Sequence, residues 1–228
     1  MNESVNKGLE RHFKSHADRI HQGARRLGYK VAFNSPAIQE QLGLDGSLVA
    51  GLAGNTLHKS PADCSLAGAT KAFLEPELAV QLAHDLPATA DADQAADAVG
   101  SVAAAIELAN FDRPFEEFED ILAEGVFHRA FTTGEWLTPP PRCNLHGLRA
   151  TIKLDGETRA DLDCLEATGD IPKLLVYLAR LLDGFGAQLE AGDIIICGSM
   201  TAPVAATPGS RFEVELSNGS VAAMRLGE

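Results

Sequence analysis

The sequence lacks any clustered basic segment. Its 228 residues carry 19 lysines and arginines against 32 acidic residues, a formal net charge of −13. Phosphate backbones and anionic lipids are bound by grouped lysine and arginine, so we expect neither nucleic acid nor a membrane as a partner. No run approaches the roughly twenty apolar residues of a membrane span. The amino end, MNESVNKGLERHFK, has no apolar core of the signal-peptide type, and we therefore expect a cytoplasmic protein.

Cysteine pairs and the common nucleotide motifs are also missing. The four cysteines form no C-x-x-C pair, which argues against a zinc knuckle or a disulfide framework, and we expect reduced, mostly buried thiols. No G-x-S-x-G, P-loop or G-x-G-x-x-G segment is present. Serine-hydrolase, nucleotide and dinucleotide functions are therefore not indicated.

What the sequence has is enough apolar residues for one core. A hydrophobic content of 45% in a chain of this length predicts a single domain over residues 1–228. An N-terminal helix is expected within residues 1–28, because apolar residues recur there at steps of three and four. This stripe comprises Phe13, Ala17, Ile20, Ala24 and Leu27. His12 and His16 lie four apart on the same helix, but no third metal ligand is apparent and we expect both at the surface.

Short strands and hairpins dominate the rest of the chain. Asp155-Gly156 and Asn218-Gly219 are typical of hairpin turns between alternating segments. Other expected elements are a strand over 29–34, a helix from Pro36 to Gly43, a loop over 54–68, a strand pair within 70–87, a strand over 102–110, a helix over 115–124, a helix from Pro172 and a core strand over 192–201. This order predicts an α+β protein whose sheet rolls or folds on itself.

Three glutamates stand out as candidates for chemistry. Glu75 and Glu77 are two apart on a strand-like segment, so both carboxylates point to one face. A divalent cation would relieve their repulsion, although a solvated outer face is the commoner explanation for such a pair. Glu107 is the only charged residue in SVAAAIELAN, where an unpaired carboxylate would be costly. It needs either an arginine partner or a metal, and three carboxylates with water can complete a Mg²⁺ or Mn²⁺ site.

Four motifs in the right order resemble the fumarylacetoacetate hydrolase superfamily, on the side of the 2-keto-4-pentenoate hydratases and 4-oxalocrotonate decarboxylases. They are GYKVAFNS, EPELA followed by HDLP, AIELAN 32 positions after the first glutamate, and GDIIICGSMTAPVAATPG. The resemblance implies a rolled mixed β-sheet with flanking helices and a Mg²⁺ or Mn²⁺ ion held by Glu75, Glu77 and Glu107. It also implies small-molecule 2-oxo acid substrates from aromatic catabolism and a homo-oligomer, with possible association between a hydratase and a decarboxylase.

The resemblance assigns roles to further residues. Lys30 occupies the family's lysine position and is expected to bind the substrate carboxylate or assist proton transfer; a lysine reaching solvent is the alternative. Ser199 and Thr201 are expected to hold substrate oxygens, although small residues of this kind also suit a tight turn. His128 could lie near the site, but the sequence does not place it.

The expected reaction is hydration of a 2-hydroxy-2,4-dienoate or 2-keto-4-enoate by a Mg²⁺-dependent lyase. A 4-oxalocrotonate-type decarboxylase, an acylpyruvate C–C hydrolase and a catalytically weakened metal-binding partner subunit are the alternatives. The chain departs from the family pattern at four places. The helical region ahead of Lys30 is shorter than in typical hydratases of this group. Ala32 stands where a glycine is usual, Glu124-Gly125 stands where an Asp-Asn pair is usual, and the segment 57–60 has no acidic residue.

Overall fold

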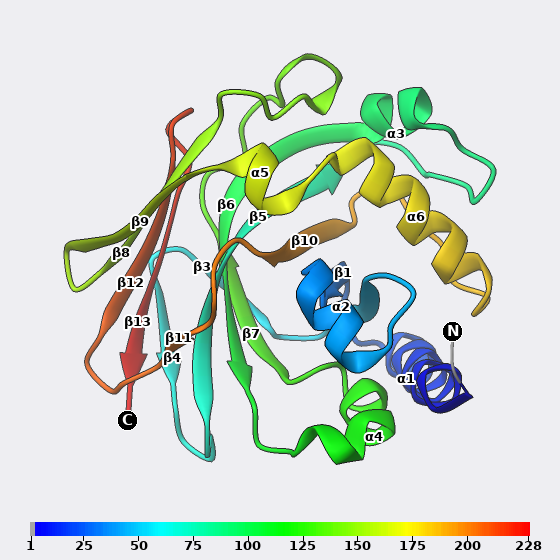
Figure 1. The fold of residues 1–228 in the computed structure, drawn as a ribbon, viewed down its shortest axis with the longest axis horizontal. Coiled ribbons are helices and arrows are strands. Elements are labelled where there is room, and N and C mark those ends of the chain that lie inside the picture. The colour runs from blue at the N-terminus through cyan, green and yellow to red at the C-terminus, as the bar shows by residue number, and fades with distance from the viewer. Residues whose placement is uncertain (1–2) are drawn as a thin grey trace.

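Two β-sheets organise the protein, whose computed structural model describes residues 3–228 (Figure 1). The larger sheet has, in spatial order, β2 (Leu48–Ala53), β1 (Arg26–Ala32), β10 (Ile194–Ser199), β5 (Ala72–Leu82), β6 (Val99–Asn110), β7 (His128–Thr133) and β3 (Leu57–Lys59), with β11 (Val204–Ala205) also paired to β5. The smaller sheet has β4 (Ala62–Ser65), β13 (Val221–Gly227), β12 (Arg211–Leu216), β8 (Arg149–Leu154) and β9 (Glu157–Asp163). Both sheets are mixed, since β1 with β10, β3 with β7 and β4 with β13 run parallel.

Helices flank the larger sheet. They are α1 (Glu3–His21), α2 (Pro36–Leu42), α3 (Ala92–Ala98), α4 (Phe118–Ala123), α5 (Cys164–Thr168) and α6 (Ile171–Asp183), with short 3-10 turns η1 (Phe115–Glu117) and η2 (Pro141–Cys143). β5 and β6 curve between the smaller sheet on one side and α1, α2, α4 and α6 on the other (Figure 1). The predicted α+β class with a curled mixed sheet is therefore confirmed. Within residues 3–228, no helix has both the length and the apolar character needed to cross a bilayer.

The central strands β5 and β6 are buried on both faces. On one face Leu78 and Ala104 join the main hydrophobic core. On the other face Ala79 and Ala105 belong to a smaller apolar cluster with Phe131. Because strand side chains alternate, the odd-numbered glutamates of β5 and β6 share the face of this smaller cluster. A carboxylate on that face is surrounded by protein rather than by water.

Both predicted hairpins are confirmed, as β8–β9 and β12–β13. Three other expectations were wrong. The first helix ends at His21 and β1 begins at Arg26, so the helix does not extend to residue 28. The segment 70–87 contains one long strand, whose antiparallel partner is β6, and not a strand pair. The expected loop 54–68 contains β3 and β4, which pair only with strands distant in sequence.

The prediction that His12 and His16 are exposed was also wrong. They are 2% and 5% exposed, because α1 buries the stripe from Val5 to His16 rather than the stripe through Ala17. The backbone N–H of Gly51 on β2 donates to Nε2 of His12 at 2.7 Å. A Cβ at Gly51 would lie 2.6 Å from the His16 ring, so the absence of a side chain lets the helix approach the strand.

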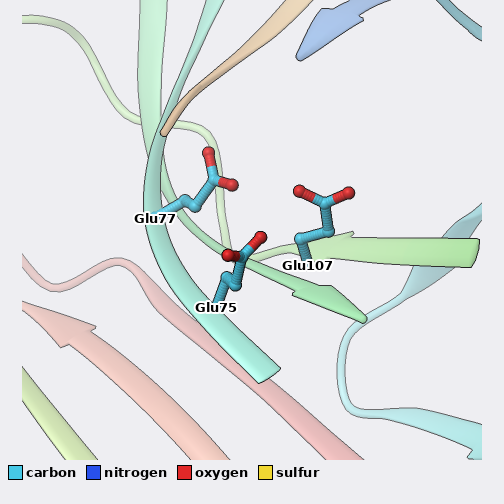
Figure 2. A group of neighbouring side chains, drawn as sticks. All are labelled: Glu75, Glu77 and Glu107. Carbon is cyan, nitrogen blue, oxygen red and sulfur yellow. The ribbon is translucent and has the colours of Figure 1, made fainter. Parts of the chain in front are cut away.

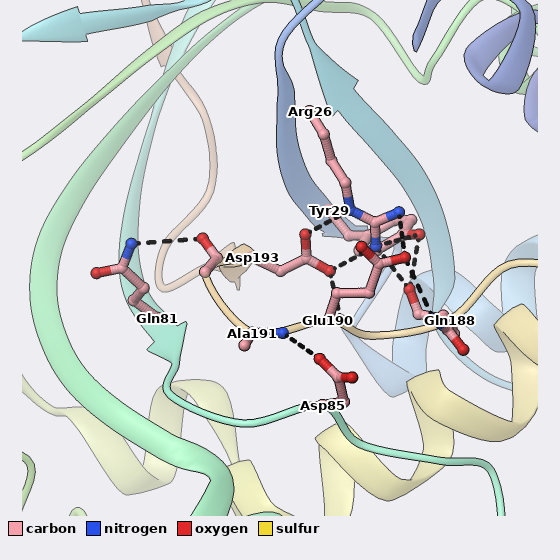
Figure 3. A network of polar contacts seen from close by, with 9 residues as sticks. Arg26, Tyr29, Gln81, Asp85, Gln188, Glu190, Ala191 and Asp193 are labelled. Carbon is pink, nitrogen blue, oxygen red and sulfur yellow. Dashed lines mark hydrogen bonds and ion pairs between the residues drawn. The ribbon is translucent and has the colours of Figure 1, made fainter. Parts of the chain in front are cut away.

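A buried ion pair fixes β1 against the segment that leads into β10 (Figure 3). Arg26 donates from Nε and Nη2 to the two carboxylate oxygens of Asp193 at 2.8 and 2.7 Å. Asp193 also accepts the backbone N–H of Glu190 at 2.9 Å, while Arg26 and Tyr29 both donate to the carbonyl of Gln188. These bonds hold the two parallel strands in register, and β1 carries Lys30 opposite Ile196 of β10.

Candidate metal centre

The pairing of β5 with β6 brings the three predicted glutamates together. Glu75 lies directly opposite Glu107 in the antiparallel register, and Glu77 lies opposite Ala105 on the same face. Each residue offers a carboxylate oxygen within 4.8 Å of the others. Figure 2 shows the carboxylates pointing into one space from two strands. Glu77 is 1% exposed and Glu75 is of intermediate exposure, so the alternative that this pair lies on a solvated outer face was wrong. Glu107 is 0% exposed.

Pro76 sits between the first two glutamates in a central strand, where a proline normally removes a ladder hydrogen bond. Its carbonyl accepts the Met200 N–H at 2.8 Å, so the backbone of residue 76 faces the β10 side of the strand. On that side β10 pairs through Ser199 opposite Glu77, and β11 begins only at Val204 opposite Leu74. The proline therefore occupies the break between two partners, where no N–H is required.

An irregularity in β10 supplies a hydrogen bond to Glu77. The register of β10 against β5 shifts between Ile196 and Ser199, which releases the N–H of Gly198 from the ladder. That N–H donates to Oε2 of Glu77 at 2.7 Å. Gly198 has a φ of +97°, and a Cβ there would lie 2.5 Å from the Asn34 side chain. Glycine is therefore required both by the backbone conformation and by the close approach.

Lys30 lies beside the three glutamates and is buried, so the alternative of a lysine reaching solvent was wrong. Its Nζ donates to Oε1 of Glu107 at 2.5 Å and to the carbonyl of Val126 at 2.9 Å. Val126 and Phe127 follow Gly125 and all three have positive φ, which is rare for a β-branched residue such as valine. This strained turn directs the Val126 carbonyl toward the lysine, and such strain is concentrated at functional sites.

His128 is the residue of this cluster that sequence reasoning did not place. Its Nδ1 lies 2.7 Å from Oε1 of Glu107, and Nε2 is buried without a partner. β7 pairs with β6 next to Glu107, which brings the start of β7 to the glutamate. The apolar residues Ala130 and Phe131 that follow His128 could have indicated a buried strand that begins at the histidine. The sequence analysis did not predict this strand, β7. Glu107 thus pairs with a lysine and a histidine, and not with the arginine considered as its alternative partner.

The hydrogen-bonding pattern leaves oxygens free on the side where the carboxylates meet. Oε1 of Glu77 and Oε2 of Glu107 are buried and have no hydrogen-bond partner among the described residues. Buried charges are normally paired or bound to a metal. Three carboxylates without a histidine or cysteine ligand suit a hard cation such as Mg²⁺, Mn²⁺ or Ca²⁺. The residues present therefore fit a divalent ion.

The pKa values follow from burial and from the charges that face each group. Burial raises the pKa of Glu75 to about 7, and repulsion from Glu107 adds to the shift. Burial also raises the pKa of Glu77 well above its usual value, again with repulsion from Glu107. For Glu107, burial is outweighed by the charge of Lys30 and the contact with His128, which lower its pKa to about 2. A divalent ion would compensate the charge of the other two carboxylates.

A cavity of about 740 Å³ opens onto Glu75 and Lys30. Ser199 and Thr201 both line it, as expected for residues near a substrate. Their hydroxyls donate within their own loop, from Ser199 to the carbonyl of Thr201 at 2.8 Å and from Thr201 to the carbonyl of Ala202 at 2.9 Å. The hydroxyl oxygens can still accept hydrogen bonds. Both explanations for these residues, a tight turn and a substrate contact, are compatible with this geometry.

The positions that depart from the family pattern are distributed unevenly. Ala32 lines the cavity. Glu124 lies outside it and forms an ion pair with Arg113 at 2.7 Å on the surface. The segment 57–60 lines a different cavity, beside Trp136 and Arg211. Ala32 is therefore the only one of these residues that lines the candidate site, although Gly125 begins the turn that carries Val126 and Phe127 of its wall.

Comparison with known proteins finds similar sequences and structures. A 4-oxalocrotonate decarboxylase from Pseudomonas sp is 30% identical over 217 residues, covering 93% of this chain and 83% of the relative. A 2-keto-4-pentenoate hydratase from Paraburkholderia phymatum is 29% identical over 215 residues, covering 90% and 80%. The structure of 4-oxalocrotonate decarboxylase from Pseudomonas putida G7, complexed with calcium and acetate, has a TM-score of 0.85 at 19% identity and covers 94% of this chain and 83% of that one.

A family model also matches most of the chain. Its description is fumarylacetoacetate (FAA) hydrolase C-terminal, and it matches residues 44–226. This range contains the three glutamates and the Gly198 loop but begins after Lys30. The chain belongs to the fumarylacetoacetate hydrolase family.

Proposed function

We propose that this protein is a Mg²⁺-dependent lyase in which Glu75, Glu77 and Glu107 hold the ion. The observation that carries the proposal is the pair of buried, unpartnered oxygens on Glu77 and Glu107 that face one space. An isolated carboxylate oxygen in such surroundings is costly, and a cation is the partner that this geometry accommodates. Structures of a similar decarboxylase with calcium and with magnesium are consistent with it.

A 2-oxo acid or its 2-hydroxy-dienoate tautomer is the substrate class that fits. When bound, Mg²⁺ would act as a Lewis acid toward the carboxylate and the 2-oxygen and stabilise negative charge on that oxygen. Lys30 has three N–H donors and uses two of them on Glu107 and Val126. The third can hold the substrate carboxylate or assist proton transfer. Ser199 and Thr201 line the same cavity, and in this proposal their hydroxyl groups contact substrate oxygens.

His128 and Val126 are positioning residues in this proposal. His128 contacts Oε1 of Glu107, the same oxygen that accepts the hydrogen bond from Lys30. The two groups together fix the carboxylate and would leave its other oxygen, Oε2, for the ion. Partners of this kind orient metal ligands, and their loss typically lowers metal affinity about 10- to 100-fold.

Hydration of a 2-hydroxy-2,4-dienoate is the reaction that we place first. Water adds across the distal double bond, with hydroxide bonding to C4 and a proton to C5. The resulting 2,4-dihydroxy-2-enoate then loses the proton of its 2-hydroxyl and gains one at C3, which gives the 4-hydroxy-2-oxo acid. No oxidant or further reactant is needed. Several similar proteins are named 2-keto-4-pentenoate hydratases, at identities of 28–29%.

Decarboxylation of a 4-oxalocrotonate-type acid is the second candidate. It is favoured by the relative that is 30% identical and by the structure with a TM-score of 0.85, both named 4-oxalocrotonate decarboxylase. Loss of CO₂ also leaves negative charge on a 2-oxo acid, so the same carboxylates and lysine would serve it.

The direct test is to incubate the purified protein with Mg²⁺ and 2-hydroxypenta-2,4-dienoate and to follow the loss of ultraviolet absorbance. Metal-dependent loss with formation of 4-hydroxy-2-oxopentanoate is expected, and Mn²⁺ in place of Mg²⁺ compares the two ions. Release of CO₂ from 2-hydroxyhexa-2,4-dienedioate without any hydration would instead favour the decarboxylase. Absence of metal-dependent turnover on both compounds would overturn the proposed activity.

A further inference from the structure

The charges around the candidate cavity are unevenly distributed. Among the described residues that line it, Lys30 is the only lysine or arginine, and no histidine is present. The acidic residues are Glu75, at the proposed metal site, and Glu166, which is exposed near the end of β9 in α5. A second anionic group on a ligand would therefore meet no free cation away from the metal site.

Lys30 cannot serve such a distant group. Its side chain is 3% exposed and its ammonium lies 2.5 Å from Glu107, one of the three carboxylates of the candidate metal centre. Glu107 thus neutralises the charge of Lys30. The ammonium group lies where the metal and the 2-oxo acid group of the substrate would bind. The remainder of the wall has no positive charge to offer.

Aromatic side chains line the cavity as far as its exposed mouth, where Phe115 is 49% exposed, whereas Lys30 is buried. They are Phe33, Phe111, Phe115 and Phe127, and we call them the phenylalanine wall. Their rings form a connected series, with centroids 6.4 Å apart for Phe33 and Phe115, 6.2 Å for Phe115 and Phe127, and 4.8 Å for Phe111 and Phe127. Rings packed in this way present an apolar surface without a hydrogen-bond donor.

Two side chains at this cavity remain exposed although they are apolar. Phe115 on η1 is 49% exposed and Ile38 on α2 is 38% exposed, and both belong to the cavity lining. Exposed apolar groups gathered at one pocket mark a binding surface. An apolar ligand group placed between them would remove their surface from water, whereas a carboxylate there would lose hydration without gaining a cationic partner.

We propose that the substrate of this protein ends in an uncharged, apolar group, and that the phenylalanine wall discriminates against substrates with a second carboxylate at that end. The proposal rests on the proposed function for the orientation of the substrate, with the 2-oxo acid group at the glutamates. It names the class as monocarboxylic 2-hydroxy-dienoates with hydrogen, alkyl or aryl at the distal carbon.

The test uses pairs of compounds that differ only at the distal end. For binding without turnover, 2-oxohexanoate and 2-oxohexanedioate are titrated calorimetrically into the full-length protein with Mg²⁺. For turnover, 2-hydroxyhexa-2,4-dienoate and 2-hydroxyhexa-2,4-dienedioate are compared by kcat/KM. We expect the monocarboxylic compound to be favoured by at least about tenfold in each pair.

A charge placed at the cavity mouth should shift this preference. Phe115→Arg supplies the missing cation, and we expect it to move the ratio of the two affinities toward the dicarboxylic acid by at least about tenfold. Val221→Arg is the matched control, because Val221 is also an exposed apolar residue at 40% but does not line this cavity. It adds the same charge and should leave the ratio unchanged. Ile38→Arg replaces Phe115→Arg if the latter does not fold.

The outcomes separate this proposal from the proposed function. Selective binding of 2-oxohexanoate without turnover of any dienoate would overturn the reaction but support the selectivity. Turnover of both dienoates with similar kcat/KM, or tighter binding of 2-oxohexanedioate, would support the activity and overturn the selectivity. Failure of both 2-oxo acids to bind in the presence of Mg²⁺, together with absence of turnover of both dienoates, would overturn both.

Discussion

Two buried charge clusters lie on the same sheet, and they differ in how completely their polar atoms are paired. In the Arg26–Asp193 cluster each carboxylate oxygen of Asp193 accepts a hydrogen bond from the guanidinium, and Tyr29 and a backbone amide complete the network (Figure 3). In the glutamate cluster, whose carboxylates point into one space (Figure 2), Glu77 and Glu107 each retain a buried oxygen that has no hydrogen-bond partner within residues 3–228.

The difference indicates that the Arg26–Asp193 cluster stabilises the fold and that the glutamate cluster binds a ligand. A buried ion pair with all its hydrogen bonds can offset the cost of removing its charges from water, whereas an incompletely paired one cannot. The glutamate cluster therefore lowers the stability of the metal-free protein. We expect a bound ligand to compensate the free-energy cost of these unpaired carboxylates. Replacement of an acid by its amide should therefore have opposite effects on the stability of the metal-free protein in the two clusters.

The largest effect is expected for Glu77→Gln. The glutamine can still accept the Gly198 N–H, so the fold is preserved, but the ligand charge is lost. Metal-assisted charge stabilisation is worth several kcal/mol, so we expect turnover to fall on the order of 10³-fold. Removal of the metal with a chelator should have a similar effect on the unaltered protein. The melting temperature without metal should stay equal or rise, and Mg²⁺ should no longer increase it.

Asp193→Asn should have the opposite effect on stability. It leaves Arg26 without its charged partner, and we expect a loss of about 2–4 kcal/mol, less than for a fully buried pair because Arg26 is 27% exposed. The melting temperature should fall by roughly 2–4 °C per kcal/mol. Asp161→Asn is the control: its pair with Arg149 is about half exposed, at 51% and 53%, and should contribute less than about 1 kcal/mol. Equal melting temperatures for Asp193→Asn and Glu77→Gln would contradict the contrast between the clusters.

Metal binding should depend on pH because protons compete for the glutamates. Burial raises the pKa of Glu75 to about 7, so its proton must leave before the ion binds. The apparent affinity for Mg²⁺ should increase by about tenfold per pH unit below 7 because of Glu75, and deprotonation of Glu77, whose pKa is also raised, should add to this increase. Titration calorimetry across pH 5.5–8.5 measures this change.

The same shift predicts the pH dependence of the metal-free fold. The folded state binds the Glu75 proton more tightly than the unfolded state does. The stability that this proton contributes is therefore fully present below the ordinary pKa of 4.5 and is lost as the pH rises through about 7. Melting without metal should therefore show falling stability over that window, and saturating Mg²⁺ should reduce the fall. A metal affinity that does not change with pH would contradict the assignment of Glu75 as a ligand.

The smallest effect is expected at a third buried pair, His12 and His16. Both ring nitrogens of His16 lack a partner, whereas His12 accepts the Gly51 N–H. His16→Leu should therefore increase stability by about 1 kcal/mol at pH 7, since an unpaired buried polar group is removed. His12→Leu is the matched control and should decrease stability, because it leaves the Gly51 N–H unpaired.

Acid should enlarge the effect of His16→Leu. Burial, with the charge of Arg19, lowers the pKa of His16 to about 4 from 6.5. The stability that depends on the neutral ring is present above pH 6.5 and is lost as the pH falls toward 4. Chemical denaturation at pH 7 and pH 5 should show a larger gain for His16→Leu at pH 5. An equal increase in stability at both pH values would contradict the lowered pKa of His16.

Sequence reasoning went furthest where a local pattern has one structural consequence. The hairpins at Asp155-Gly156 and Asn218-Gly219 are confirmed, because their turn residues act through the backbone alone. The convergence of Glu75 and Glu77 follows from strand alternation, and Glu107 was conspicuous as a lone charge in an apolar run. The exposure predicted for the His12 face was wrong because packing of α1 against β2 and α4, and not local polarity, decides which stripe is buried.

The sequence by itself determined the α+β class, the family motifs and which three acidic residues are unusual, since these depend on residue type and short spacings. Only the tertiary structure decided that Glu75 lies opposite Glu107, that Lys30 and His128 share one oxygen of Glu107, and that a phenylalanine wall continues the cavity. These contacts join residues from distant segments, and their geometry is set by strand register and by a strained turn. No local pattern encodes those distances, because they result from the packing of the whole chain.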